Sequence, residues 1–218
     1  MRLLLTACLL LLLPGTAAAA DLSLTLSPPA GVQYGTAQEA GGRLTEGAAP
    51  LAGQVVELQA RAYPYEGAFA TIATTSTGAD GAYAFERRFR RNMQLRAVAP
   101  AQLVTSRARR AYVFPRPRST FKALSRRRLR ITQFLRTPDG VHLTAPTVFY
   151  LGPAKARTAP RVATARPRRI GHGRFKASVT VTLPRAWNGS FRYGSCFRYS
   201  EGSGMGNPKA RCPERYRF

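Results

Sequence analysis

Acidic side chains are scarce in this chain, which has 34 Lys and Arg residues but only 10 Asp and Glu residues. The shortage falls on the second half. Residues 21–100 hold seven acids and seven arginines, whereas residues 101–218 hold three acids and 26 basic residues. This asymmetry indicates two units and favours a polyanionic partner for the second. Only four of those 26 are lysines, and an arginine- and alanine-rich composition is typical of a GC-rich bacterial genome.

Histidine is rarer still, with only His142 and His172 in the chain. A Ser-His-Asp triad or a histidine metal site would need one of them. His172 lies between two glycines, and we interpret it as a loop residue. The sequence contains no Gly-x-Ser-x-Gly, His-Glu-x-x-His or Gly-x-x-x-x-Gly-Lys motif, and its carboxylates show no spacing typical of a glycosidase pair. We therefore predict a protein that is not an enzyme and has no cofactor or metal.

Long apolar runs are absent after the first residues of the chain. Residues 3–13 form an apolar run of about eleven, shorter than the roughly 18 needed to span a bilayer. Arg2 precedes this run, and three alanines at 18–20 provide a small-residue cleavage site before Asp21. We interpret residues 1–20 as a secretory signal peptide rather than a transmembrane anchor. The mature chain is then secreted or extracytoplasmic.

Cysteine is the last residue in short supply. Cys8 lies inside the expected signal peptide, which leaves Cys196 and Cys212. An even pair in an exported protein predicts a disulfide. A closed loop of that size contributes about 3 kcal/mol in the chain-entropy account. Two cysteines without a histidine nearby in the sequence are too few for a metal site.

The sequence is rich in short alternating segments separated by turn residues, which is typical of antiparallel β-sandwiches. The clearest strand is 54–63, where Val56, Leu58 and Ala60 face one way. Residues 78–81, Gly-Ala-Asp-Gly, are suited to a hairpin turn. We predict an all-β protein whose first unit, residues 21–105, contains about seven strands.

Several short motifs lie along the first unit. They are Tyr34-Gly35, Gly42-Arg43-Leu44, Pro50-Leu51-Ala52-Gly53, Val56-x-Leu58-Gln59 and the segment 75–85 with its Asp80-Gly81. Over roughly residues 22–99 this pattern resembles bacterial secreted Ig-like domains, including the carboxypeptidase-regulatory-like sandwiches. The resemblance implies an Ig-like β-sandwich with a spacer, adhesion or ligand-presenting role, and it transfers no catalytic residue.

The second unit is predicted to begin after an arginine- and proline-rich linker, residues 106–118. Residues 119–218 are predicted to be a basic β-rich domain, either Ig-like or a degenerate sandwich. Residues 125–136 alternate like a strand, and we expect them to form a hairpin with residues 141–144 through the turn at Asp139 and Gly140. Residues 157–169 are interpreted as a basic loop or irregular edge, and 175–183 as the best strand of this half.

Nine arginines crowd into 24 residues of the second half, interleaved with Tyr112, Phe114 and Phe121. This combination suits a polyanion-binding groove, because guanidinium groups pair with phosphate or sulfate and stack on rings. A solvated basic face without a ligand is an equally open interpretation. The predicted polyanion-binding residues are Arg107, Arg109, Arg110, Arg116, Arg118, Arg126, Arg127, Arg128 and Arg130.

Together these features favour a non-catalytic exported binding or structural module. Its expected partner is an anionic envelope polymer or acidic polysaccharide, contacted through the second unit; export argues against nucleic acid. The alternative is a carbohydrate-binding or adhesion module that acts through the first unit, with Tyr63, Tyr65 and Phe69 at the ligand. Trp187 is a further residue that could stack on a sugar ring, although such residues more often pack on a sandwich edge.

Overall fold

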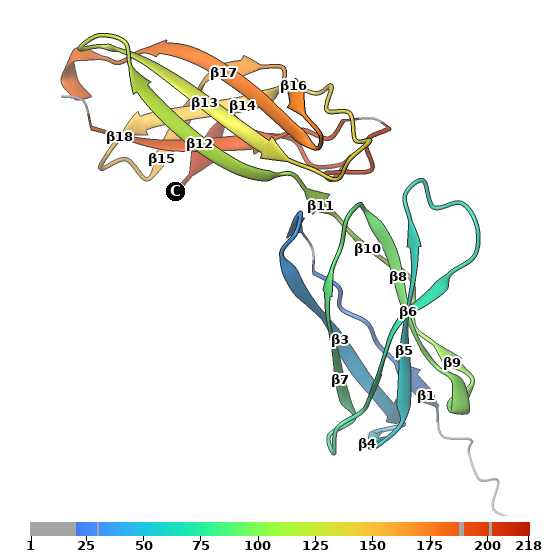
Figure 1. Ribbon diagram of the computed structural model, residues 1–218. Helices are drawn as coiled ribbons and strands as arrows, with labels where there is room; N and C mark the ends of the chain where they lie inside the picture. The colour runs from blue at the N-terminus through green and yellow to red at the C-terminus, as the bar shows by residue number, and fades with distance from the viewer. Residues whose placement is uncertain (1–20, 30, 188–189, 201) are drawn as a thin grey trace, which may run out of the picture.

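We analysed a computed structural model that describes residues 21–29, 31–187, 190–200 and 202–218; the expected signal peptide, 1–20, lies outside these ranges. The protein is all-β, as the sequence predicts, with strands β1–β19 and two single-turn 3-10 helices, η1 (Pro100–Gln102) and η2 (Arg185–Trp187). The strands form two domains that meet near β11 (Figure 1). Within the described ranges, no helix has the length and apolar character that crossing a bilayer needs.

The first domain contains two antiparallel sheets. In one, β3 pairs with β1, β4 and β7; in the other, β5 and β8 are central, β6 and β10 lie outside them, and β9 also pairs with β8. A short parallel pair, β2 with β11, lies at the end nearest the second domain. The bounds are β1 Leu22–Leu24, β2 Val32–Gln33, β3 Ala37–Glu46, β4 Ala49–Pro50, β5 Val55–Ala62, β6 Ala70–Ser76, β7 Ala82–Arg88, β8 Met93–Ala99, β9 Val104–Thr105, β10 Arg109–Ala111 and β11 Val113–Phe114.

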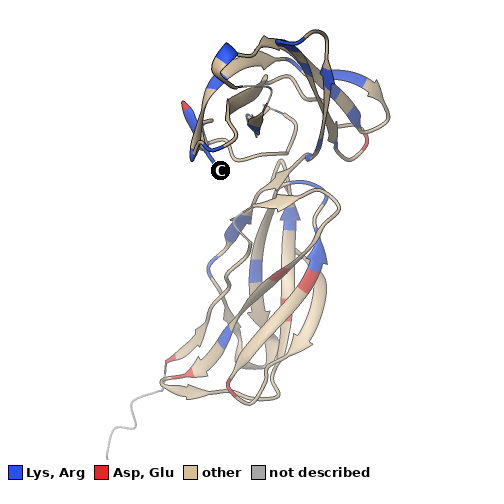
Figure 2. Cartoon of the chain, turned by 90° about the vertical axis from the view of Figure 1, so that its left-hand side faces the viewer, with Lys and Arg blue, Asp and Glu red and all other residues tan. Residues whose placement is uncertain are grey.

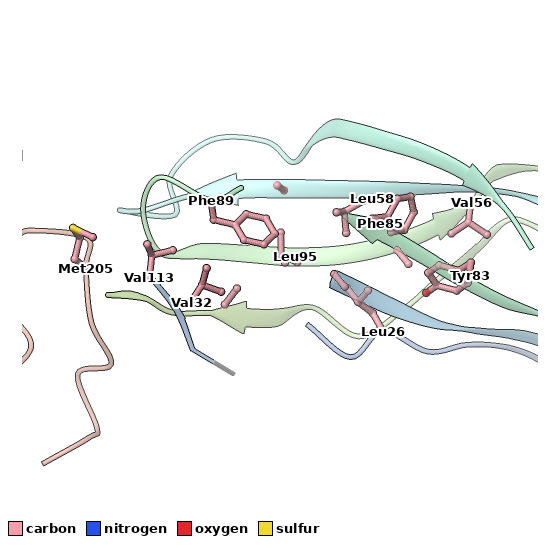
Figure 3. Close-up of a cluster of buried hydrophobic side chains, with 14 of the residues drawn as sticks. Leu26, Val32, Val56, Leu58, Tyr83, Phe85, Phe89, Leu95, Val113 and Met205 are labelled. Carbon is pink, nitrogen blue, oxygen red and sulfur yellow. The ribbon is translucent and has the colours of Figure 1, made fainter. Parts of the chain in front are cut away.

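Alternation along the strands decides what this domain buries. Val56 and Leu58 on β5 point into the core, as the sequence predicts, and are fully buried. Tyr83 and Phe85 on β7 enter the same core from the opposite sheet, with ring centroids 5.6 Å apart (Figure 3). Burying an apolar side chain of this size contributes about 1.5–3 kcal/mol. The two facing rows of side chains therefore hold the sheets together.

The second domain contains two four-stranded antiparallel sheets. Their orders are β12-β13-β17-β16 and β18-β14-β15-β19. The bounds are β12 Arg116–Ala123, β13 Arg128–Arg136, β14 Thr147–Pro153, β15 Thr158–Ala165, β16 Arg168–Gly171, β17 Arg174–Thr182, β18 Phe191–Phe197 and β19 Arg215–Arg217. The inner faces of the two sheets share one apolar cluster, which includes Ile131 on β13, Phe149 on β14 and Ala177 on β17. The second domain is therefore a β-sandwich of its own.

The tail of the chain covers the outer face of the second sheet. Strand β14 is buried on both faces along nearly its whole length. Val148 and Tyr150 point away from the inner core into a separate cluster with Tyr216 and the two cysteines. The Tyr150 hydroxyl donates a 2.5 Å hydrogen bond to the carbonyl of Pro213 in the tail. The Cys196–Cys212 disulfide, with Cα atoms 5.7 Å apart, joins this tail to β18.

The stretch 106–118, expected to be a linker, forms strands instead. Strands β10 and β11 belong to the first domain, and β12 begins the second at Arg116. Proline is tolerated here because β12 is an edge strand, so the missing N–H of Pro117 leaves no partner strand unpaired. Only Pro115 separates the last strand of one domain from the first strand of the next.

The expected hairpin between 125–136 and 141–144 does not form. Gly140 does turn the chain with a φ of 73°, but residues 141–144 are not a strand. Both edges of β13 are already occupied, by β12 and β17, so a third partner has no place. Val141 and Leu143 are nevertheless buried, in the apolar cluster that reaches from the first domain into the second.

The segment 157–169 was expected to be a loop or irregular edge, but it contains the whole of β15 and the start of β16. Its two prolines disfavour a strand when the sequence is considered alone. In the structure the pairing of β15 with β14 extends only to Arg161, so β14 needs no hydrogen bond from Pro160. Pro167 falls between the two strands.

A loop of the second domain inserts into the end of the first and fixes the joint between them. Met205 in this loop is fully buried and packs in the same cluster as Val32 and Val113 (Figure 3). Asn92 is buried beside it, donates through Nδ2 to the Gly206 carbonyl at 2.8 Å and accepts at Oδ1 from the Val113 N–H at 2.8 Å. The Nδ2 bond of Asn92 crosses the joint, and its Oδ1 bond to Val113 holds the amide in place from within the first domain. Apolar and polar contacts together therefore tie the two domains.

Candidate polyanion-binding face

The outward side of the sheet β12-β13-β17-β16 carries a dense set of basic residues, which we call the basic face. Its members occupy outward positions of all four strands, as the strand register places them. They are Arg116, Arg118, Lys122, Arg128, Arg130, Arg136, Arg168, Arg174 and Lys176. All are exposed.

Strand alternation explains why these side chains gather on one side. On β13, Leu129 and Ile131 are buried in the sandwich while Arg128 and Arg130 are exposed. On β17, Phe175 and Ala177 are likewise buried between exposed basic and hydroxyl residues. Residues directly opposite each other on paired strands share a face, so the inward apolar residues force the charged residues of both strands outward together.

The basic face is most crowded at the end that adjoins the first domain. There Arg116, Arg136 and Arg174 lie opposite one another on three neighbouring strands. The next row holds Arg118, Phe134, Lys176 and Arg168. A row of hydroxyls, which includes Thr132 and Ser178 joined by a 3.0 Å hydrogen bond, separates these from Lys122 and Arg130 at the far end.

No carboxylate neutralises this charge within the described residues. The one ion pair that they contain joins Arg43 to Asp80 at 3.0 Å, in the first domain. Asp139 and Glu214 are the acids described beyond residue 118, and neither lies on the basic face. Like charges directly opposite each other on a sheet are destabilising, by about 0.2–1 kcal/mol a pair. The face therefore keeps an unfavourable charge density that an anionic ligand would relieve.

Two shallow hollows lie on the basic face. One, of about 690 Å³, lies among Arg116, Arg136 and Arg174, with Ile170 exposed at its side. The other, of about 580 Å³, contains Arg130, Arg168 and Lys176 beside the hydroxyl row. Phe134 borders both hollows and offers an apolar surface between the cations. Such a surface can hold anionic groups and a less polar backbone at the same time.

The nine arginines that the sequence singles out divide among three places. Arg116, Arg118, Arg128 and Arg130 lie on the basic face. Arg126 and Arg127 lie in the turn between β12 and β13, where Arg127 Nε donates to the Leu183 carbonyl at 3.1 Å. The remaining three lie on the first domain: Arg107 precedes β10, Arg109 is on it, and Arg110 stacks over Tyr65 at 5.0 Å from the ring centroid.

Five members of the basic face are not among the nine predicted arginines. They are Lys122, Arg136, Arg168, Arg174 and Lys176. Arg168, Arg174 and Lys176 come from strands far along the chain, and only the pairing of β13 with β17 and of β17 with β16 brings them to this face. Lys122 and Arg136 lie on β12 and β13 themselves, beside the predicted arginines. The alternation of 175–183 was the available signal, because it already placed Lys176 on an outward position.

The aromatic residues considered for a sugar site in the first domain already have partners. The guanidinium groups of Arg61 and Arg96 lie over the Phe69 ring, 4.7 and 4.3 Å from its centroid. Tyr63 and Tyr65 contact each other edge to face at 5.6 Å. Trp187 packs against the core of the second domain. These rings therefore present less free surface than their sequence positions indicate.

The remaining chemical groups form no constellation in the described part of the chain. His142 and His172 are both exposed and lie in loops. No three His, Cys, Asp or Glu residues of that part come close enough together to hold a metal ion. Burial raises the pKa of four tyrosine hydroxyls, and none of the four lies on the basic face. They are Tyr65, Tyr83, Tyr150 and Tyr193.

Comparison with known proteins adds no assignment. No protein-family model matches the chain, and no curated protein matches it.

Proposed function

We propose that this chain is a non-catalytic exported module that binds an anionic polymer of the cell envelope or extracellular space through the basic face. The observation that carries the proposal is the gathering of nine uncompensated cations on one open sheet face. Seven of the nine are arginines, whose planar guanidinium groups pair bidentately with phosphate, sulfate or carboxylate.

An extracytoplasmic location is part of this proposal. The Cys196–Cys212 disulfide supports it, because structural disulfides persist in oxidising compartments. The apolar run at 3–13 and the alanines at 18–20 support it independently. The likeness of the first domain to bacterial secreted Ig-like domains belongs to the same proposal, in which that domain acts as the spacer that presents the basic face.

The test is a salt series of binding by the mature chain to heparin, to long-chain polyphosphate and to isolated envelopes. A triple variant, Arg118→Ser, Arg130→Ser and Lys176→Ser, removes three charges from the basic face. Its matched control, Lys155→Ser, Arg157→Ser and Arg217→Ser, removes three exposed charges from the other sheet and its turn. The slope of log K against log salt should become shallower by about 0.7–0.9 for each anionic group that the first variant no longer neutralises. The slope of the control should stay unchanged.

Two results would contradict the proposal. The first is an absence of binding to all three polymers at low salt. The second is an equal loss of affinity in the two triple variants, which would assign the binding to net charge rather than to a face. The carbohydrate alternative makes the opposite prediction, namely binding that ignores salt and depends on Tyr65 and Phe69.

A further inference from the structure

Four arginines of the first domain lie at the joint, beside the loop that follows β13. Arg87, Arg88, Arg90 and Arg91 line a cleft of about 610 Å³ together with Pro138 and Asp139 of the second domain. The cleft has an apolar floor that includes Ile72 and Met93. Figure 2 shows most basic positions of the first domain toward this end, whereas acidic positions lie at its far end and along the middle of its strands.

The cleft adjoins the basic face directly. Arg136 borders the larger hollow of the face, and Pro138, two residues further along the chain, lines the cleft. Two residues of extended chain span at most about 7 Å, so the two depressions are neighbours. At the same junction the Arg91 guanidinium lies 3.9 Å from the position that a Cβ on Gly140 would take. The arginines of the cleft therefore reach the loop that directly follows β13.

Resting on the proposed function, we propose that the binding site continues over the joint and that its ligand is a long linear polyanion in contact with both domains. Along β13 alone, the outward positions from Arg128 to Arg136 extend roughly 27 Å, at about 3.4 Å per residue. We call this row of outward positions together with the cleft the track. The track is longer than a compact headgroup or a small anion can cover. Its apolar walls strengthen the attraction of the arginines, because they focus the field of like charges.

The rigid joint gives the track its energetic advantage. Met205 and Asn92 hold the domains in one arrangement, so a polymer bound to the basic face meets the arginines of the cleft at a fixed distance. The second contact is then intramolecular and needs no hinge to be ordered. Linkage of this kind raises affinity by on the order of a hundredfold or more without any new type of contact. A ligand too short to reach the cleft gains nothing from it.

Asp139 is an acidic residue within the proposed site, and its replacement tests the proposal. It is the one acid lining the cleft, it is exposed, and no ion pair holds it. A carboxylate between two groups of arginines repels a passing polyanion. Its replacement by asparagine should therefore strengthen the binding of a long polymer.

The experiment compares tripolyphosphate with long-chain polyphosphate by calorimetry, on the full mature chain. The cleft variant carries Arg87→Ser, Arg88→Ser and Arg90→Ser, which are all exposed, and keeps the half-buried Arg91. The control is the triple variant Lys155→Ser, Arg157→Ser and Arg217→Ser. We expect the cleft variant to lose about tenfold in affinity for the long polymer relative to the control. Its affinity for tripolyphosphate should match the control, and Asp139→Asn should bind the long polymer about two- to fivefold more tightly than the unchanged chain.

The outcomes separate this inference from the function on which it rests. Equal affinity of the cleft variant and the control for the long polymer would overturn the inference and leave the basic face as the whole site. The same holds if Asp139→Asn binds the long polymer no more tightly than the unchanged chain. Failure of the unchanged protein to bind long-chain polyphosphate, heparin or envelopes would instead refute the proposed function itself. An unchanged thermal midpoint in the cleft variant and in the control establishes that a loss of affinity is not caused by unfolding.

Discussion

The two sheets of the second domain have central strands of similar length, but the outer face of one sheet is covered and the outer face of the other is exposed. The outer side of β14 carries Val148 and Tyr150 and is covered by the tail and its disulfide. The outer side of β13 carries arginines and Phe134 and is covered by nothing in the described chain. The same sandwich thus uses its last residues to close one face and leaves the other open. Because the open face carries the charge, it is the face for which we propose a partner.

The largest expected difference between the two outer faces comes from truncating the aromatic residue on each of them. Tyr150→Ala should lower the free energy of unfolding by about 3–5 kcal/mol, since the side chain is fully buried and its hydroxyl is bonded. Phe134→Ala should cost roughly 1 kcal/mol, because that ring is only half-buried. Urea denaturation of the two variants measures both losses. Equal losses of unfolding free energy would mean that the outer side of β13 is as well covered as the outer side of β14.

Removal of the disulfide tests whether the cover is needed by the open face. The double variant Cys196→Ser and Cys212→Ser should lose about 3 kcal/mol of stability, because its unfolded chain gains the freedom of the opened loop. Polyanion binding should persist at temperatures where the variant is folded, since the tail covers the other sheet. Thermal unfolding with and without reductant provides the control: reductant should destabilise the unchanged protein and leave the double variant as it was.

A charge reversal on the open face is expected to produce the smallest change in stability. Lys122→Glu places a carboxylate opposite Arg130 in the sheet register and should stabilise the domain by about 0.2–1 kcal/mol at low salt. High salt should abolish the gain, because the Debye length shrinks to a few ångströms at about 1 M. Lys155→Glu, in a turn of the other sheet, is the matched control and should change neither stability nor affinity. A Lys122→Glu variant that binds polyanions as tightly as before would argue against the basic face as the site.

Local pattern was enough to predict the all-β fold, the inward and outward sides of β5, β13 and β17, and the disulfide. It failed where the outcome depended on which strands pair. Residues 141–144 alternate well enough for a strand, yet β13 had already bonded on both edges. The prolines of 106–118 and 157–169 signalled loops, because a sequence does not show that they fall on an edge strand or past the end of a pairing.

The candidate site was predictable only in part, for the same reason. Arg116, Arg118, Arg128 and Arg130 are close in sequence and were found. Arg168, Arg174 and Lys176 join them only through long-range register, which local density does not report. Lys122 and Arg136 are close in sequence to the predicted arginines and share β12 and β13 with them. Local density also included arginines that the chain places on the first domain, because density along the sequence does not report which sheet a strand enters.

The insertion of Met205 has a consequence for the order in which the chain folds. The amide of Asn92 bonds to a carbonyl 114 residues later, so the first domain cannot complete its upper end from its own residues. During synthesis from the N-terminus, that end stays open to water until nearly the whole chain has emerged. Contacts of such long sequence separation form slowly. The first domain to be made therefore stays unfinished until the second is nearly complete. A chain cut before Met205 would leave both sandwiches incomplete, because it also lacks Cys212 and β19.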